Sequence, residues 1–263
     1  IREVKVNYKS VILNKSDRIG TITLNRPDAN NTFNIELATE LNNALQDMEN
    51  DQEVNVVIIN ANGKNFCTGI DVRYVDGKSH AEYVAWSELM GRMNITMSEM
   101  GKPVIASVRN IAVANGVGIV AASDIAIATK NARFGATAVN IGLFCMGPAV
   151  PLLRNLGRKK TLELIMTGEL INADEALRIG LINKVVNDDE LESETLKFAR
   201  KLADKSPIAL QSGKKSFYKM EDLNLRQALD LTDNHFATLC TTEDGQEGVK
   251  AFLDKRKPVW RIK

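Results

Sequence analysis

The chain has 263 residues, of which 44% are hydrophobic and 25% are charged, an ordinary composition for a globular protein with a sizeable core. Lys and Arg total 34 against 33 Asp and Glu, so the net charge of +1 indicates neither nucleic acid nor an anionic membrane surface as a partner. Three widely spaced cysteines and 2 His argue against a disulfide framework and a metal site. We therefore expect no metal and a reducing, cytoplasmic compartment.

No segment is long and apolar enough to span a bilayer. The most apolar stretch, residues 111–128, is interrupted by Asn115, Ser123 and Asp124. The visible start, Ile1–Lys5, is too charged for the apolar stretch of a signal peptide.

The hydrophobic pattern predicts strands alternating with helices, which indicates an α/β layered core. A hairpin is expected first, with strands at Ser10–Leu13 and Ile19–Leu24 and a turn at Lys15–Arg18. The pattern then predicts helices from Asn34 to Met48 and over Glu82–Met100, and buried strands at Val56–Asn60, Val104–Val108 and Ile125–Thr129.

Beyond about Ala173 the pattern is mostly helical. We expect helices at Ala173–Ile179, Leu191–Asp204, Ala209–Met220, Leu225–Leu239 and Glu243–Asp254. The chain is accordingly divided into a core of residues 1–186 and a helical region of residues 187–263, which should pack on the core or on a neighbouring subunit.

Three glycine-bearing loops follow predicted strands: Phe66–Asp71, Ala114–Gly118 and Phe134–Gly142. Loops that leave a strand and enter a helix expose backbone N–H groups, which suit an oxyanion or a phosphate. Each loop alone is a weak signal, and Ala114–Gly118 lacks the third glycine of a dinucleotide fingerprint.

Together with further motifs, these loops give the chain a family resemblance from about Val11 to Trp260. The chain resembles the enoyl-CoA hydratase/isomerase (crotonase) superfamily. The matching segments are Leu24–Ala29, Asn65–Asp71, Lys102–Ala106, Ser123–Ala128, Ala132–Gly135, Leu164–Gly168, Ala173–Ala176, Gly180–Val186 and Glu247–Leu253. The resemblance implies an α/β, crotonase-like spiral of repeated ββα units with a C-terminal helical trimerisation region, assembled as a homotrimer or hexamer.

The resemblance also implies an enzyme of fatty acid metabolism that binds an acyl-CoA thioester. Its oxyanion hole would hold an enolate between the amides of Ile70 and Asn115, and coenzyme A would enter as part of the substrate rather than as a permanently bound cofactor. The expected contacts with the CoA thioester are Arg26, Ala29, Thr68, Gly69, Asp71, Arg73, Gly116, Gly118, Ala138, Phe252 and Lys255, of which Phe252 and Lys255 resemble a pair that reaches a neighbouring subunit's CoA.

Two departures from the family pattern bear on the reaction. Hydratases of this family hold and activate water with two glutamates, and the corresponding positions here carry Gly118 and Ala138. The Asn115 side chain, where the family has glycine, should narrow or repolarise the pocket. We therefore expect isomerase, decarboxylase (lyase) or hydrolase chemistry rather than hydration.

Candidate substitutes for the missing acid–base groups are Tyr74, Lys78 and His235. A decarboxylase branch of the superfamily also lacks both glutamates and uses Tyr, Lys and His near such positions. On a helix, Tyr74 and Lys78 would share a face. However, Asp76-Gly77 favours a loop here. The plainer interpretation is that Tyr74 and Lys78 are surface residues and that His235 is a packing residue.

Other polar groups have simpler explanations. Cys145 is expected to be a core residue rather than a nucleophile, Asp71 to cap a helix, and Asp124 to bind backbone. Two further hypotheses stay open beside the enzyme: a catalytically silent acyl-CoA-binding homologue and a purely structural trimer.

Overall fold

A computed structural model describes residues 8–261, and its centre is a six-stranded sheet. The strand order is β1-β2-β3-β4-β6-β9, in which β1 is antiparallel to β2 and the remaining neighbours are parallel. A second, three-stranded sheet has the order β5-β7-β8. The strands are β1 Val11–Ser16, β2 Ile19–Leu24, β3 Val56–Ala61, β4 Val104–Val108, β5 Ile111–Val113, β6 Ile125–Thr129, β7 Arg133–Gly135, β8 Ile171–Asn172 and β9 Lys184–Val186.

The N-terminal hairpin is confirmed, but its turn is tighter than predicted. Strand β1 continues to Ser16, and only Asp17 and Arg18 connect the strands, both with positive φ (53° and 64°). Two left-handed residues match the right-handed twist of a hairpin. The polar residues Asn14–Ser16 therefore belong to the strand, because an edge strand can face water.

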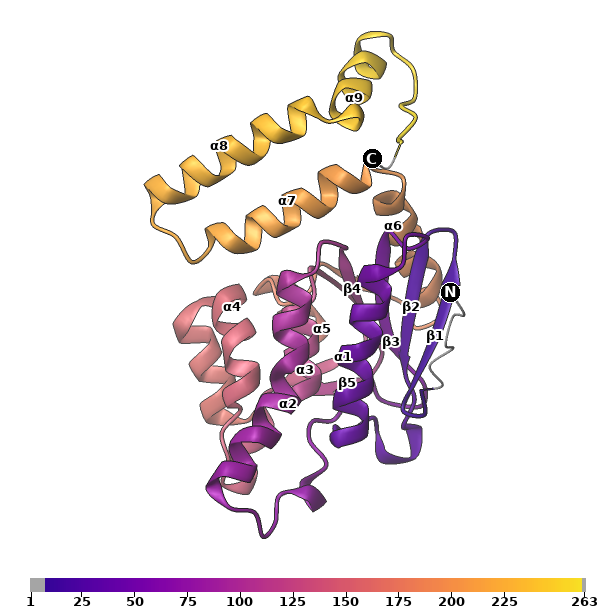
Figure 1. Ribbon diagram of the computed structural model, residues 1–263. Coiled ribbons are helices and arrows are strands. Elements are labelled where there is room, and N and C mark those ends of the chain that lie inside the picture. Colours follow the sequence, from indigo (N-terminus) through magenta and orange to yellow (C-terminus); the bar gives the residue numbers. More distant parts are fainter. Residues whose placement is uncertain (1–7, 262–263) are drawn as a thin grey trace.

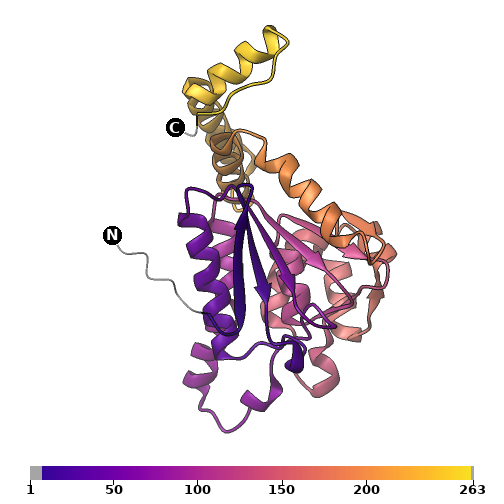
Figure 2. The ribbon, with the colours of Figure 1, turned by 90° about the vertical axis from the view of Figure 1, so that its right-hand side faces the viewer.

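Helices cover both faces of the main sheet (Figures 1 and 2). The larger apolar core lies between the sheet and helices α1 (Ile35–Asn50), α2 (His80–Glu99) and α3 (Asn115–Ala122). On the other face, α6 (Leu191–Ala203) covers a smaller cluster with its buried Ala199 and Ala203. Of the three strands predicted to be buried, β4 is buried throughout, β3 is half-buried at Asn60 and Ala61, and β6 is half-buried at Ile125.

The helix α4 (Met146–Thr167) was not predicted from the sequence. Its first half contains Gly147, Pro148 and Pro151, and Gly157 interrupts the helical geometry with φ 70° and ψ 170°. Proline and glycine obscure the helical pattern. Helix α3 had no predicted range either, whereas the helices that were predicted begin close to their expected positions. Helix α2 starts two residues early because Ser79 and Glu82 form a capping box.

The C-terminal helices form an arm beside the core, at the top of Figure 1. Helix α7 packs on α2 and α8, and α9 packs on α7 and α8. In contrast, α6 lies on the sheet, so the proposed division at residue 186 separates a sheet-covering helix from that sheet. The arm consists of α7 (Pro207–Met220), α8 (Leu225–Thr241) and α9 (Glu243–Leu253). The remaining helix is α5 (Ala173–Arg178), and three short 3-10 turns are η1 (Pro27–Ala29), η2 (Val72–Tyr74) and η3 (Thr137–Ile141). Within residues 8–261, no helix combines the length and apolarity needed to cross a membrane.

Candidate oxyanion site and its surroundings

The first glycine loop is held between two other segments by its backbone. On one side, the Cys67 amide donates to Ile111 O (3.1 Å) and Cys67 O accepts from the Val113 amide (3.0 Å). On the other side, Phe33 donates to Gly69 O (2.7 Å) and accepts from the Asp71 amide (2.8 Å). Because N–H groups alternate along an extended segment, the Ile70 amide points away from Phe33.

The second loop enters helix α3 through a strained residue. Ala114 has φ 48° and ψ −115°, and its amide donates to Gly135 O at 2.9 Å. A non-glycine residue in such a conformation costs about 1–3 kcal/mol and is found where a functional geometry requires it. Asn115 is the first residue of α3, so its amide has no acceptor inside the helix.

Glycines bring the two loops into contact. A Cβ at Gly69, whose φ is +97°, would stand 2.8 Å from the Ala114 Cβ, and a Cβ at Gly116 would stand 2.2 Å from Cys67 O. No side chain fits between these backbones. Within the described part of the chain, neither the Ile70 nor the Asn115 amide donates a hydrogen bond to the protein. Two N–H groups without an acceptor in the protein therefore lie on loops that touch.

The side chain of Asn115 is directed to a neighbouring helix. It is 9% exposed, and its Nδ2 donates to the Met90 carbonyl of α2 at 3.3 Å. The bond joins α2 to the first turn of α3. The Asn115 side chain thus tethers the two helices, and the expected narrowing or repolarisation of the pocket stays a prediction.

A buried carboxylate organises the end of the first loop. Asp71 is 4% exposed and accepts from Arg73 at Nε (2.7 Å) and NH2 (2.5 Å), while Arg26 NH2 lies 3.5 Å away. The Arg73 hydrogen bonds hold the pKa of Asp71 below its ordinary value. Asp71 also caps η2 through the Arg73 amide, which confirms its expected capping role. Arg73 is 75% exposed and Arg26 only 16%.

The expected CoA contacts near this carboxylate lie on adjoining loops. Thr68 donates through its amide to Asn30 O at 3.2 Å, next to Ala29 at the end of η1. The buried Asn31 side chain donates to Asn62 O and Asn65 O at 2.9 Å each, which ties the two loops together. Sequence reasoning missed Asn31, although asparagine is among the few residues that readily adopt its positive φ of 54°.

The two positions that lack glutamates sit against the start of α4. A Cβ at Gly118 would lie 3.5 Å from the Cβ and Cγ of Pro148. The Ala138 amide faces the Cys145 thiol, and burial raises the pKa of that thiol. Cys145 is 4% exposed, and a thiol that stays protonated is a poor nucleophile. The predicted core role of Cys145 fits this environment.

Tyr74 and Lys78 lie on an irregular surface segment rather than on one helix face. Tyr74 is the last residue of η2 and is 38% exposed. The Lys78 ammonium donates to the backbone carbonyl of Tyr74 and lies 5.9 Å from the centre of the Tyr83 ring. The loop geometry suggested by Asp76-Gly77 is therefore present.

His235, Phe252 and Lys255 belong to the C-terminal arm. His235 is half-buried on α8, which packs on α7 and α9 of its own chain. Phe252 is 82% exposed near the end of α9, and Lys255 follows that helix with φ 54°. Figure 1 shows the arm and the Tyr74 segment (below α2) at opposite ends of the molecule, so one chain does not bring His235 to Tyr74 and Lys78. Within residues 8–261, no group of three or more His, Cys, Asp or Glu side chains is arranged to hold a metal ion.

The comparisons with known proteins agree with this fold. The family described as enoyl-CoA hydratase/isomerase matches residues 14–263. Mouse enoyl-CoA hydratase domain-containing protein 3, mitochondrial, is 36% identical over 251 residues, which cover 94% of this chain and 82% of that protein. A crotonyl-CoA hydratase of Syntrophomonas wolfei is 32% identical and covers 95% of this chain and 97% of its own.

Solved structures of enoyl-CoA hydratases also resemble this chain. A Mycobacterium smegmatis enoyl-CoA hydratase superposes with a TM-score of 0.93 at 34% identity, covering 96% of this chain and 99% of that one. The human enoyl-CoA hydratase domain-containing protein 3 gives 0.92 at 36% identity, covering 96% and 100%. The fold is that of a crotonase-type α/β protein with a C-terminal helical region. The chain belongs to the enoyl-CoA hydratase/isomerase (crotonase) family, which confirms the resemblance found in the sequence.

Proposed function

We propose that the protein is an acyl-CoA enzyme that stabilises an enolate of its thioester substrate between the amides of Ile70 and Asn115. The observation that carries the proposal is the contact between their two loops, where Gly69 and Gly116 allow backbone to meet backbone. Both amides lack a partner in the described part of the chain. An oxygen placed between them would receive two hydrogen bonds from donors that are already oriented.

Such donors act when negative charge develops on the thioester oxygen. Fixed N–H dipoles need no reorganisation during the reaction, and losing one donor of this kind typically lowers the rate by about 10²–10³-fold. The nucleotide end of CoA is assigned to the loops that carry Ala29 and Thr68, with the exposed guanidinium of Arg73 available to its phosphates. Coenzyme A enters as part of the substrate, and no permanently bound cofactor is proposed.

Isomerisation and decarboxylation, which pass through an enolate, are favoured over hydration. Thioester hydrolysis, which passes through a tetrahedral oxyanion in the same site, stays a third candidate and would need a base from another segment to activate its water. Gly118 and Ala138 supply no group that could hold or activate water. Tyr74 and Lys78 remain the candidate acid–base groups close in sequence to Ile70. His235 can join them only through assembly, because α8 packs on α7 and α9 in its own chain.

A second candidate function is acyl-CoA binding without catalysis. It is favoured by the absence of Asp and Glu from residues 114–122 and 134–145 and by the burial of Cys145, which raises the pKa of its thiol. Both candidates require the thioester oxygen between Ile70 and Asn115, but only the enzyme requires proton transfer.

Infrared spectroscopy of bound butyryl-CoA labelled with ¹³C at the thioester carbonyl tests the proposed site. We expect the carbonyl band to move to lower wavenumber on binding, because two hydrogen bonds polarise the C=O group. Replacing Ile70 or Asn115 by Pro deletes one N–H, and either variant should lose much of the shift. Ile35→Pro is the matched control, since Ile35 is also a first helical residue, is 49% exposed and lies on α1.

An unshifted band in the wild-type complex would overturn the proposed site. Deuterium exchange at C2 of the same thioester in D₂O then separates the two functions. Exchange of the C2 protons supports an enolate-forming enzyme for this thioester class. A shifted band without exchange supports the binding protein instead.

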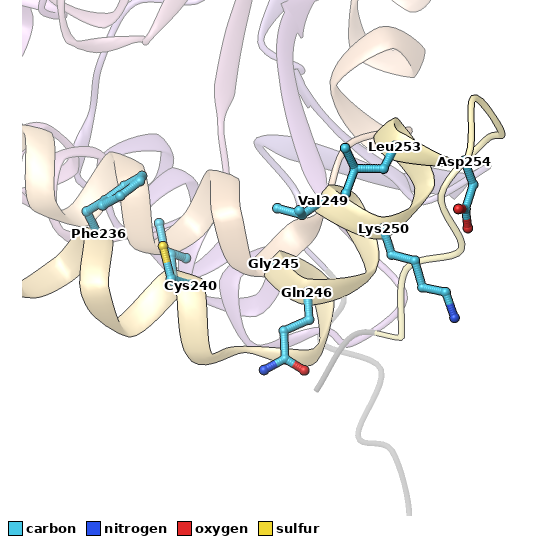
Figure 3. A pocket seen from close by; sticks show the side chains of 9 residues that line it. Phe236, Cys240, Gly245, Gln246, Val249, Lys250, Leu253 and Asp254 are labelled. Atoms are coloured by element: carbon cyan, nitrogen blue, oxygen red, sulfur yellow. The ribbon is translucent and has the colours of Figure 1, made fainter.

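We also infer that the chain assembles as a trimer or hexamer. Large apolar side chains are exposed on the arm and on α4, including Phe236 (70%), Phe252 (82%), Leu253 (72%) and Met166 (61%). Between α8 and α9 lies an apolar groove of about 570 Å³. Figure 3 shows Val249 on the side toward Cys240 and Lys250 directed away. Sedimentation of a stable monomer at micromolar concentration would contradict the assembly.

The proposed compartment is reducing and cytoplasmic. Cys67, Cys145 and Cys240 are all free thiols, as such a compartment allows. No nucleic-acid or membrane partner is proposed. Fractionation of cells that express the tagged protein tests the compartment, and retention in an oxidising or membrane-bounded fraction would contradict it.

A further inference from the structure

The orientation of the Ile70 amide depends on how the segment at residues 69–71 pairs with the segment at residues 32–34. The two segments meet in an isolated parallel bridge between Phe33 and Ile70. Two backbone hydrogen bonds hold this bridge, one from Phe33 N to Gly69 O (2.7 Å) and one from Asp71 N to Phe33 O (2.8 Å). So short a pairing is marginal by itself and gains from side chains that cross it.

The guanidinium of Arg26 crosses this bridge and binds both of its segments. Its NH1 donates to the carbonyl of Thr32, the residue before Phe33. Its NH2 lies 3.5 Å from the carboxylate of Asp71, the residue after Ile70. One rigid, planar cation therefore connects the residues that flank the bridge on its two sides.

The backbone of Arg26 is fixed as well. Its amide donates to Asn31 Oδ1 at 2.8 Å, and its carbonyl accepts from the amides of Ala29 (3.0 Å) and Asn31 (2.9 Å). The Asn31 side chain in turn donates to the carbonyls of Asn62 and Asn65. A side chain that starts from a fixed backbone can hold its partners in one geometry.

Burial separates the roles of the two arginines around Asp71. The side chain of Arg26 is 16% exposed and that of Asp71 is 4% exposed, whereas Arg73 is 75% exposed. Water and salt screen a buried ion pair much less than an exposed one. Arg73 is open to a phosphate of the substrate, while the guanidinium of Arg26 is directed to partners inside the protein.

We propose that Arg26 is a positioning residue, which holds the Ile70 amide toward the thioester oxygen through Asp71 and the Thr32 carbonyl instead of binding CoA. The inference rests on the proposed function, because Ile70 supplies one of the two proposed oxyanion donors. Its physical basis is the steep dependence of such a donor on position, since a misplacement of about 1 Å can cost about 10²-fold in rate.

The free protein gives the first test, through ¹⁵N relaxation of its backbone amides in Arg26→Met. We expect the Ile70 amide to become more mobile than in the wild type, while the Asn115 amide on α3 keeps its order. Arg154→Met is the matched control, because Arg154 also binds two partners, Glu221 (3.1 Å) and Asp222 (2.6 Å). It should leave Ile70 unchanged.

An Ile70 amide that keeps its order in Arg26→Met would overturn the proposal. The same holds if the Arg154→Met control mobilises Ile70 equally. Because this measurement uses no ligand, it decides the role of Arg26 whether or not the proposed reaction is correct.

Bound butyryl-CoA, labelled with ¹³C at its carbonyl, gives the second test. In Arg26→Met we expect the band to lose part of its shift and any C2 exchange to slow about tenfold, less than the 10²–10³-fold of a deleted donor. The dissociation constant should stay within about twofold of the wild-type value. Weakened binding with an unchanged band would assign Arg26 to CoA and overturn the proposal. A wild-type band without a shift overturns the proposed oxyanion site instead.

Two further variants test the route through Asp71. Arg26→Lys serves if Arg26→Met fails to fold, and an intermediate loss is expected because an ammonium lacks the planar fork that reaches both partners. Asp71→Asn should also mobilise the Ile70 amide. Combined with Arg26→Met, it should add less than the sum of the two single effects, since both remove the same connection. Fully additive effects would contradict the route.

Discussion

The Lys214 ammonium lies 2.7 Å from the Asp124 carboxylate, and the two side chains are only 8% and 18% exposed. Asp124 also accepts from the Val104 amide (2.7 Å) and from the Tyr218 hydroxyl (2.9 Å). One carboxylate thus joins α7 to the beginnings of β4 and β6. The Lys214–Asp124 pair fixes the C-terminal arm to the core. The bond from the Val104 amide confirms the prediction that Asp124 binds backbone.

Lys214→Ala should therefore destabilise the protein strongly. Removing one partner of a buried pair leaves an uncompensated charge and typically costs about 3–5 kcal/mol. Urea unfolding at a fixed protein concentration measures the loss. Lys219→Ala, at an exposed position on the same helix, is the control and should change the free energy of unfolding by no more than about 0.5 kcal/mol. Equal effects of the two variants would contradict the assigned role.

Glu49 makes a second connection between α1 and the arm, and this one depends on pH. Burial alone would raise its pKa, but the amides of Gly101 and Lys102 and the Lys215 ammonium lower it below the ordinary value of 4.5. A carboxyl group with a lowered folded-state pKa stabilises the fold above its unfolded pKa. That contribution is lost as pH falls from about 4.5 through the folded-state value.

Glu49→Gln should consequently be less stable than the wild type at pH 7, and the difference should shrink as the pH falls below 4.5. Urea unfolding of both proteins at several pH values measures it. Glu88→Gln, at an exposed position on α2, should show no such dependence. A constant difference between wild type and Glu49→Gln would show that charge is not the cause.

Two glycines on α3 make a matched pair. A methyl group at Gly116 would stand 2.2 Å from Cys67 O, whereas one at Gly118 would meet Pro148 at an ordinary 3.5 Å. Gly116→Ala should thus destabilise the fold by about 1–3 kcal/mol through overpacking. Gly118→Ala should be neutral or stabilise it by up to about 1 kcal/mol, because alanine favours a helix. Thermal unfolding compares them, and equal stability of the two variants would contradict the loop contact.

Much of the fold followed from periodicity and turn chemistry. The helix predicted from Asn34 is present as α1, and Asn34 itself caps it, since its side chain accepts from the Leu37 amide. Helix α4 was not predicted because Pro151 and Gly157 interrupt its helical pattern of hydrophobic residues. Packing against its neighbours, rather than local helix propensity, holds this segment helical.

The candidate site was predictable in part. Glycine loops after strands indicated where N–H groups would be exposed, and the family pattern assigned them to Ile70 and Asn115. The sequence could not reveal the strained backbone of Ala114 or the bond from Asn115 to Met90, because both depend on how distant segments pack. The contact of Lys78 with the Tyr74 carbonyl is local, and the Asp76-Gly77 signal for a loop did not specify the turn geometry that produces it.

The most direct chemical prediction concerns crotonyl-CoA. A general acid or base contributes about 10²–10⁴-fold in rate, and Gly118 and Ala138 provide neither. The unmodified protein should thus hydrate crotonyl-CoA several orders of magnitude more slowly than a two-glutamate hydratase, even with the thioester bound. The loss of enoyl thioester absorbance measures the rate. A turnover of roughly 1–10³ s⁻¹, the ordinary range for enzymes, would show that the two positions are assigned wrongly.

Restoring both glutamates should recover only part of the rate. In Gly118→Glu with Ala138→Glu, the first side chain must pass Pro148, which lies 3.5 Å from the position of its Cβ. A misplacement of about 1 Å can itself cost about 10²-fold. The double glutamine variant is the control, because it has the same shape without a carboxylate. If carboxylates at these positions activate water, the glutamate variant exceeds the glutamine variant in rate and its rate rises with pH as the base ionises. Equal rates in the two variants would mean that Pro148 and the Asn115 tether leave no room for water activation in this pocket.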